Sequence, residues 1–213
     1  KTALSYSDRP AITWGTEIWS DYAGFHRVAG AIGGALNSDY GLEAGDRVAI
    51  TMSNRPEFLE TLFGIWYAGL VAVPINSKLH PAEFAYIFDN SGARMCFTGP
   101  ELAPAVEKLM AASASLESVI VAGSDTYHKL CSVPALPYES RAPEDPAWLF
   151  YTSGTTGRPK GATLSHRNLL VMTLSYYADM DFISPDDCVL HAAPLSHASG
   201  LYALPHVAKA ANN

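Results

Sequence analysis

The chain has 213 residues, of which 48% are hydrophobic and 16% charged, a composition that is typical of a globular protein and excludes a disordered one. The formal net charge is −7 at pH 7, so nonspecific binding to nucleic acid or to an anionic membrane surface is not expected. The three cysteines, Cys96, Cys131 and Cys188, are widely spaced and form no Cys-x-x-Cys pair, so free thiols in a reducing compartment are expected.

The sequence shows no targeting or membrane-spanning segment. Residues 1–9 include a lysine, an aspartate and an arginine, so no secretory leader is predicted and the expected location is the cytoplasm. A long uncharged and strongly apolar run, residues 61–77, is interrupted by two glycines and a proline and is too short to span a bilayer. Because the chain has no initial methionine and no terminating pattern, it is expected to be a fragment of a longer protein.

In the first half of the chain, apolar strands alternate with helices. A hairpin is predicted over residues 3–14, followed by a helix from a cap at Ser20 to about Leu36. The next predicted strands are residues 48–52, 71–75, 94–98 and 119–122, and the helices between them begin at Pro56, Pro81 and Glu101. This alternation, with strands that are apolar throughout, is typical of a parallel sheet covered on both faces, so the predicted fold class is α/β.

A change in composition divides the chain. Residues 123–146 contain four prolines and several charges and are predicted to be a surface connector. We therefore predict a first α/β subdomain with this connector, residues 1–146, and the start of a second, truncated α/β subdomain, residues 147–213. The elements predicted in the second part are a strand over residues 147–150, a helix after a cap at Ser165 and a strand over residues 188–193.

The segment Tyr151–Gly161, Tyr-Thr-Ser-Gly-Thr-Thr-Gly-Arg-Pro-Lys-Gly, directly follows the first of these strands. Hydroxyls and backbone amides donate hydrogen bonds, glycine lets the backbone approach a ligand, and lysine adds a positive charge. Because successive amides in a turn form a concave anion site, the segment is predicted to bind a polyphosphate. The nucleotide loop of kinases and GTPases is excluded, since Pro159 and Gly161 stand where that motif has Gly and Ser or Thr. A solvated Gly/Thr-rich turn is the alternative, which the buried strand before the segment argues against.

A second polar segment, residues 194–200, contains His197. It is flanked by His191 and His206, but the three histidines lack the spacing of zinc ligands and no carboxylate lies among them, so no metal site is predicted.

Two other function classes stay open. A serine hydrolase would use His197 as its base and one of three nearby serines, Ser153, Ser196 or Ser199, as its nucleophile, although the Gly-x-Ser-x-Gly elbow is absent. A noncatalytic nucleotide-binding module is the other alternative. ATP binding would argue against a hydrolase and for a nucleotide-binding module or a ligase. Carboxylate-dependent exchange of pyrophosphate into ATP would then distinguish a ligase from a noncatalytic module.

The sequence from Tyr151 to Gly161, continued to Leu169, resembles the signature of the adenylate-forming (AMP-binding) superfamily, in particular its acyl-CoA synthetase and aryl-CoA ligase branch. Residues 67–76 and 194–200 resemble two further motifs of that family. The resemblance implies mainly parallel sheets flanked by helices, as in the large N-terminal domain of such an enzyme, here incomplete. The family's later motifs, for adenine, ribose, magnesium and a C-terminal catalytic lysine, do not occur before Asn213.

The resemblance also implies an activity: an AMP-forming acid–thiol ligase that uses ATP with Mg²⁺ to activate a small carboxylic acid and then transfers the acyl group to coenzyme A. The implied phosphate-binding residues are Thr152, Ser153, Gly154, Thr155, Thr156, Gly157 and Lys160. Two residues are implied to be catalytic: Lys160, as a cationic clamp on the phosphates, and His197, beside the acyl pocket. The 213-residue chain alone is expected to be inactive. No nucleic acid partner is expected, and self-association is left open.

Overall fold

The structure, a computed structural model, describes residues 1–135, 137–152 and 158–213. Its helices are α1 (Thr2–Ser5), α2 (Tyr22–Ser38), α3 (Pro56–Tyr67), α4 (Pro81–Ser91), α5 (Ala103–Met110), α6 (Asp125–Ser132), α7 (His166–Asp179) and α8 (Ala198–Ala208). Its strands are β1 (Pro10–Trp14), β2 (Glu17–Asp21), β3 (Arg47–Thr51), β4 (Val71–Pro74), β5 (Ala93–Thr98), β6 (Ser118–Val121), β7 (Pro146–Thr152) and β8 (Lys160–Ser165).

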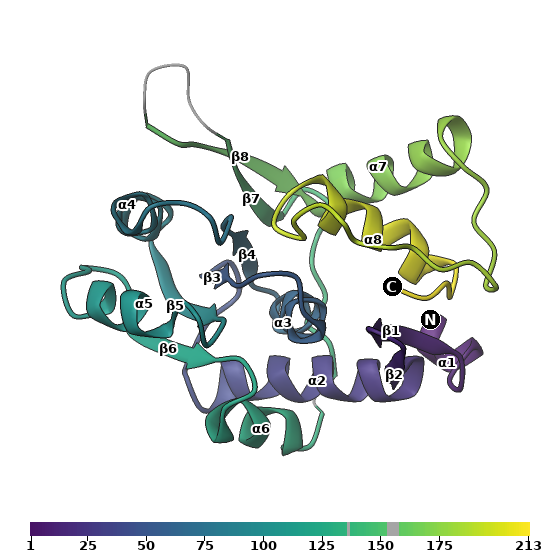
Figure 1. Cartoon of the computed structure of the whole chain (residues 1–213), viewed down its shortest axis with the longest axis horizontal. Helices are drawn as coiled ribbons and strands as arrows, with labels where there is room; N and C mark the ends of the chain where they lie inside the picture. The colour runs from purple at the N-terminus through teal and green to yellow at the C-terminus, as the bar shows by residue number, and fades with distance from the viewer. Residues whose placement is uncertain (136, 153–157) are drawn as a thin grey trace.

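One six-stranded sheet organises these elements, with the strand order β6-β5-β3-β4-β7-β8 (Figure 1). Strands β6, β5, β3, β4 and β7 run parallel, and β8 pairs antiparallel with β7 at the edge. Helices connect β3 through β6, as parallel neighbours require. The predicted α/β fold, a mainly parallel sheet flanked by helices, is confirmed.

Each face of the sheet packs against its own helices. Successive side chains of a strand point to opposite faces, so Val48 and Ile50 of β3 join a core with α2, α3 and α6, whereas Ala49 joins a core with α4 and α5. All three side chains are fully buried. Burial on both faces is why the strands are apolar throughout rather than alternating.

The predicted elements of the first half largely match the observed ones. The four predicted strands correspond to β3, β4, β5 and β6 to within one or two residues. Helices α3 and α4 begin at Pro56 and Pro81, where proline is favoured because the first helical N–H has no partner within the helix. Helix α5 begins at Ala103 instead of Glu101.

The predictions for the N-terminal segment are partly wrong: the strand that ends at Trp14 and the following helix, α2, are present, but the first strand, the turn and the helix cap are not as predicted. Residues 2–5 form α1, and the hairpin joins β1 to β2. Its turn contains Gly15 at a φ of +64°, a left-handed conformation that glycine adopts without steric cost. The helix that follows is capped by Asp21, not by Ser20: the Asp21 carboxylate accepts a hydrogen bond from the Gly24 N–H at 2.7 Å.

In the second half, the predicted start of α7 is observed, but part of the predicted connector forms a helix. Residues 125–132 of the predicted connector form α6, because Ser124 caps a helix there. Helix α7 begins after Ser165 as predicted, with a capping box that also uses Asn168. Strand β7 extends the sheet of the first half by pairing with β4, and the predicted subdomain boundary at residue 147 stays a prediction.

The predicted strand over residues 188–193 is wrong. In this segment an isolated parallel bridge joins Cys188 to Asn212, and regular pairing does not continue. A strand needs a neighbour for its backbone hydrogen bonds, and the described part of the chain places no strand beside residues 189–193. Two of their carbonyl groups, those of His191 and Ala193, accept hydrogen bonds from the side chain of Asn54.

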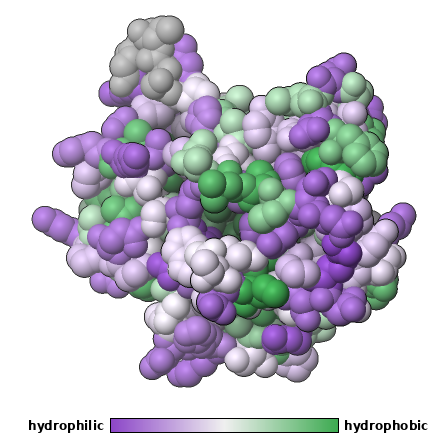
Figure 2. Space-filling view, turned by 45° about the vertical axis from the view of Figure 1, so that its right-hand side comes forward, coloured by the Kyte–Doolittle hydropathy of each residue, from purple (hydrophilic) through white to green (hydrophobic). Residues whose placement is uncertain are grey.

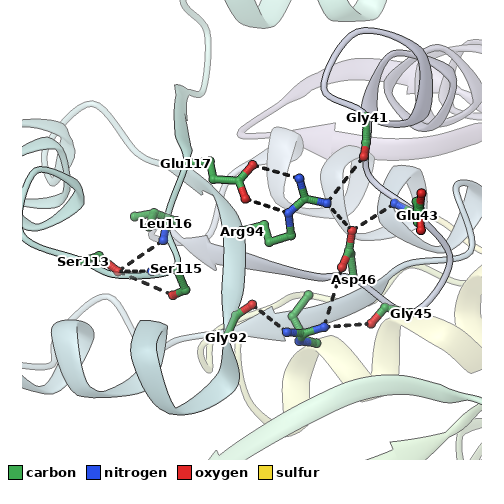
Figure 3. Close-up of polar contacts among 11 residues, drawn as sticks. Gly41, Glu43, Gly45, Asp46, Gly92, Arg94, Ser113, Ser115, Leu116 and Glu117 are labelled. Atoms are coloured by element: carbon green, nitrogen blue, oxygen red, sulfur yellow. Dashed lines mark hydrogen bonds and ion pairs between the residues drawn. The ribbon is translucent and has the colours of Figure 1, made fainter.

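An ion-pair network joins the amino ends of β3, β5 and β6 (Figure 3). The Arg94 guanidinium donates to Asp46 at 2.6 Å and to both carboxylate oxygens of Glu117 at 2.9 Å. Burial alone would raise the pKa of Asp46, but hydrogen bonds from the Glu43 N–H and Arg94 outweigh it and lower that pKa. The network therefore links these strands at their amino ends, whereas β7 ends at the opposite, carboxyl end of the parallel strands.

Helix α3 carries a carboxyl group, that of Glu60, which is buried against β2 and α6. Glu60 is only 4% exposed, and it accepts hydrogen bonds from Trp19 Nε1 at 2.8 Å and from the Tyr127 hydroxyl at 2.7 Å. Burial raises the pKa of Glu60, and the two hydrogen bonds offset that effect only in part. Ionisation of Glu60 therefore favours the unfolded chain.

Replacing Glu60 by Gln is expected to stabilise the fold increasingly as the pH rises. Because the pKa of Glu60 is raised in the folded state, the stability that its protonated carboxyl contributes is complete below its unfolded-state pKa. That stability is lost as the pH rises through the folded-state pKa. Glutamine keeps one acceptor and one donor for the same partners. Urea unfolding from about pH 4 to about pH 8 measures the difference in unfolding free energy. A difference that does not grow with pH would contradict the assigned pKa direction.

Apolar side chains are also exposed, and Figure 2 shows them gathered in the middle of one face with polar side chains around them. Large exposed apolar side chains in the second half are Leu170, Val171, Leu174, Met180, Phe182 and Leu190. The first three lie on α7, which therefore has an apolar face that the described residues leave uncovered. Among the described residues, no helix is long and apolar enough to cross a membrane.

Candidate functional site

A cavity of about 220 Å³ lies where β4 and β7 end. These strands are parallel neighbours, so their carboxyl ends meet at one edge of the sheet, the usual location of ligand sites in α/β proteins. The residues that line the cavity are Pro74, Ile75, Asn76, Leu79, Glu83, Tyr151, Thr152, Pro159, Ser196 and His197. The site thus combines the two polar segments that the sequence singled out.

The hairpin of β7 and β8 presents the base of the predicted phosphate loop. Thr152 ends β7, Lys160 begins β8, and the two residues pair directly across the hairpin, both exposed. The other predicted phosphate-binding residues, Ser153, Gly154, Thr155, Thr156 and Gly157, lie outside the described residues. Lys160 is not among the residues that line the cavity, so the structure brings Thr152 and His197, but not Lys160, to its wall.

Tyr151 fixes the hairpin to α4. Its hydroxyl donates to Asn90 Oδ1 at 2.7 Å, and its ring covers Gly161 on the paired strand. A Cβ atom at position 161 would lie 2.9 Å from that ring, which explains the glycine there. One residue before the cavity-lining Pro159, the Arg158 guanidinium lies 5.8 Å from the centre of the Tyr86 ring, also on α4.

His197 also lines the cavity and lies immediately before α8. Its imidazole is exposed and meets the Phe150 ring of β7 edge-on, with ring centres 4.7 Å apart. Its backbone N–H donates to the Pro194 carbonyl at 3.0 Å. The side chain is therefore supported on one side by an aromatic ring and keeps its polar atoms accessible.

The other two histidines of this region serve the fold. His191 Nδ1 bonds the Ser199 hydroxyl at 2.8 Å, and burial lowers the pKa of His191. His206 Nδ1 bonds the Tyr202 carbonyl at 2.7 Å. Since Ser199 is paired with His191, it does not form a nucleophile–base pair with His197. Among the described residues, no group of three or more His, Cys, Asp or Glu side chains is arranged to hold a metal ion.

The sequence did not identify three residues at or near this cavity. Asn76 lies two residues after the end of β4, and Glu83 lies in the first turn of α4, where its carboxylate accepts the His80 N–H at 3.0 Å. Asn54 lies between β3 and α3 and contacts the segment that precedes His197. The position of Asn76 after an apolar strand could have identified it, whereas the contact of Asn54 spans 137 residues or more of sequence and had no local signal.

The fold and the cavity together define an α/β protein in which a hydroxyl- and glycine-rich sequence follows the parallel strand β7. The AMP-binding enzyme family matches residues 1–210, and the chain belongs to that family. A feruloyl-CoA synthase from Amycolatopsis sp is 37% identical over 180 residues, which cover 79% of this chain and 33% of that protein. The chain therefore spans about a third of the length of this relative.

Solved structures agree with this assignment. The inhibitor-bound N-terminal domain of FACL13 from Mycobacterium tuberculosis matches with a TM-score of 0.88 and 27% identity, over 99% of this chain and 54% of that one. ATP-bound MatB from Rhodopseudomonas palustris matches with a TM-score of 0.83 and 26% identity, over 99% of this chain and 44% of that one. The predicted membership of the AMP-binding superfamily is confirmed.

Proposed function

We propose that this chain is the first part of an AMP-forming ligase, which activates a small carboxylic acid with ATP and transfers the acyl group to coenzyme A. One observation carries the proposal: Thr152, where the phosphate-loop sequence begins, and His197 line the same cavity. The curated relative is a CoA ligase by name, and an ATP-bound neighbour has the same fold. Because the chain spans a third of that relative, the complete activity needs further residues.

The residues at the hairpin suit a polyphosphate. Thr152 offers a hydroxyl donor, and Lys160, directly across from it, offers an exposed ammonium group. Ser153 to Gly157 belong to the same proposed phosphate site. When bound, ATP with Mg²⁺ supplies the electrophilic α-phosphorus and the pyrophosphate leaving group. Lys160 is the residue that we place against the negative charge that grows on the departing pyrophosphate.

The acid occupies the cavity in this proposal. Its volume of about 220 Å³ is below the roughly 300–1,000 Å³ of most small-molecule sites, so it fits the carboxyl end of an acid and not a whole ligand pair. The walls combine apolar and polar side chains, and His197 is the accessible imidazole among them. We place His197 as the hydrogen-bond donor that orients the carboxylate. The Glu83 carboxylate repels a bound anion less than a carboxylate without hydrogen bonds would, because it already accepts the His80 N–H.

The remaining partners follow from the same proposal. Coenzyme A is the acyl acceptor in this proposal, as in the name of the feruloyl-CoA synthase. The three cysteines are free, which suits a reducing compartment, and we place the enzyme in the cytoplasm.

The experiment uses a polypeptide in which this chain is continued to the length of its relatives. Labelled pyrophosphate is expected to exchange into ATP only when a suitable acid is present, across a panel of aryl and fatty acids. The 213-residue chain alone is the control and is expected to make no acyl-CoA. ATP binding without exchange for any acid would indicate a noncatalytic nucleotide-binding module. Ester hydrolysis without ATP would indicate a hydrolase.

A further inference from the structure

The side chain of Asn54 binds the backbone of the segment that leads to His197. Its Nδ2 group donates to the carbonyl oxygens of His191 and Ala193, both at 2.8 Å, and its Oδ1 accepts from the Leu195 N–H, also at 2.8 Å. Asn54 lies 137 positions before His191, in the turn between β3 and α3. One half-buried side chain therefore joins the first half of the fold to the wall of the candidate site.

These three bonds take the place of a neighbouring strand. The carbonyl oxygens of His191 and Ala193 both accept from the same Asn54 amide nitrogen. A primary amide offers two N–H donors and an acceptor, which is the set that this stretch of backbone needs. Asn54 thus satisfies backbone groups that regular strand pairing does not reach.

The bound segment continues directly into His197. Leu195 is 4% exposed and receives its N–H partner from Asn54, so it is fixed two residues before the imidazole. The His197 N–H returns to the Pro194 carbonyl at 3.0 Å, and its ring packs on Phe150. A displacement at Leu195 therefore moves His197 relative to the cavity.

We propose that Asn54 is a positioning residue: it holds residues 191–195 and thereby fixes the His197 imidazole at the acid end of the cavity. The consequence for catalysis rests on the proposed function, whereas the placement of the ring is a property of the chain itself. Aspartate is the sharpest replacement, because it keeps the size of asparagine and turns carboxylate oxygens toward two carbonyl oxygens.

The first test measures the position of the ring by NMR on the 213-residue chain. In the unchanged chain, the His197 ring protons are expected to be shifted by the Phe150 ring that they face. Asn54→Asp and Asn54→Ala are expected to move these signals toward those of an unstructured histidine and to speed amide exchange at Leu195. The alanine variant introduces no charge, so the test stays decisive if the aspartate variant fails to fold.

Ser53→Ala is the matched control. Ser53 precedes Asn54 in the same turn, and its hydroxyl donates to Glu101 at 2.9 Å, away from residues 191–195. This variant is expected to leave the His197 signals and the Leu195 exchange rate unchanged. Unchanged signals in both Asn54 variants would overturn the proposal.

The second test uses acid-dependent pyrophosphate exchange in the extended polypeptide. Asn54→Asp is expected to lower kcat/KM for the acid about 10-fold, to alter the acid profile as His197→Ala does, and to leave the KM for ATP nearly unchanged. Adding it to His197→Ala is expected to cause little further loss, because both act through one imidazole. Effects that multiply would overturn the positioning role. An unchanged polypeptide without any exchange would refute the proposed function, and the NMR result would still decide whether Asn54 holds His197.

Discussion

Replacing Lys160 by Ala is expected to slow formation of the acyl-adenylate by about 10²–10³-fold in the extended polypeptide, with much less effect on the KM for ATP. Lys160 begins β8 beside Thr152, its side chain is exposed, and it is the cation that we place against the departing pyrophosphate. Removing an interaction that strengthens as charge develops lowers kcat, whereas removing one that is equal in ground and transition states changes only KM. Pyrophosphate exchange at saturating ATP and acid measures the effect.

Arg158→Ala is the matched control for charge. It removes a cation from the same hairpin, but one whose guanidinium lies over the Tyr86 ring. Its effect on exchange is expected to be small compared with that of Lys160→Ala. Equal losses in both variants would show that the net charge of the hairpin matters and not the position of Lys160. Unchanged turnover in Lys160→Ala would remove it from the catalytic residues.

Replacing His197 by Ala is expected to lower kcat/KM for the carboxylic acid by about 10–100-fold, the usual cost of losing one hydrogen bond to a charged group. The KM for ATP is expected to change little, since we place the phosphates at Thr152 and Lys160 of the hairpin and His197 at the acid. The order of preference among short, long and aromatic acids is also expected to change, because the ring forms part of the wall that the acid contacts.

Exchange assays across the acid panel measure this change, with His191→Ala as a comparison. His191 is a neighbouring histidine that bonds Ser199 and does not line the cavity, so its loss is expected to lower stability more than acid selectivity. An acid profile for His197→Ala that matches the unchanged protein would assign His197 to the fold alone.

The parts of the fold that follow local patterns were predicted from the sequence. Apolar runs predicted β3 through β6, and prolines predicted the starts of α3 and α4. The polar residues after β7 predicted a ligand site at the end of a buried strand; a cavity lies there, and its use as a ligand site stays a prediction. Each of these signals is contained within about ten residues of sequence, which is why it could be interpreted without the structure.

The parts that depend on distant partners could not be predicted. The place of β7 beside β4 follows from packing of the whole sheet. The apolar run over residues 188–193 was predicted to be a strand, yet its carbonyls bind Asn54. Gly200 is a similar case: a Cβ atom there would lie 1.9 Å from the Leu195 carbonyl oxygen, a constraint that only the folded turn shows.

The most direct test of the proposed ligase follows oxygen from the acid into AMP. If the carboxylate attacks the α-phosphorus of ATP and the thiol then attacks the acyl carbon, one carboxylate oxygen stays on the phosphate when AMP leaves. We therefore expect the extended polypeptide, given an ¹⁸O-labelled acid with ATP and coenzyme A, to release AMP that carries one ¹⁸O for each acyl-CoA formed. Unlabelled AMP, or acyl-CoA formed with release of ADP instead of AMP, would contradict activation through an acyl-adenylate.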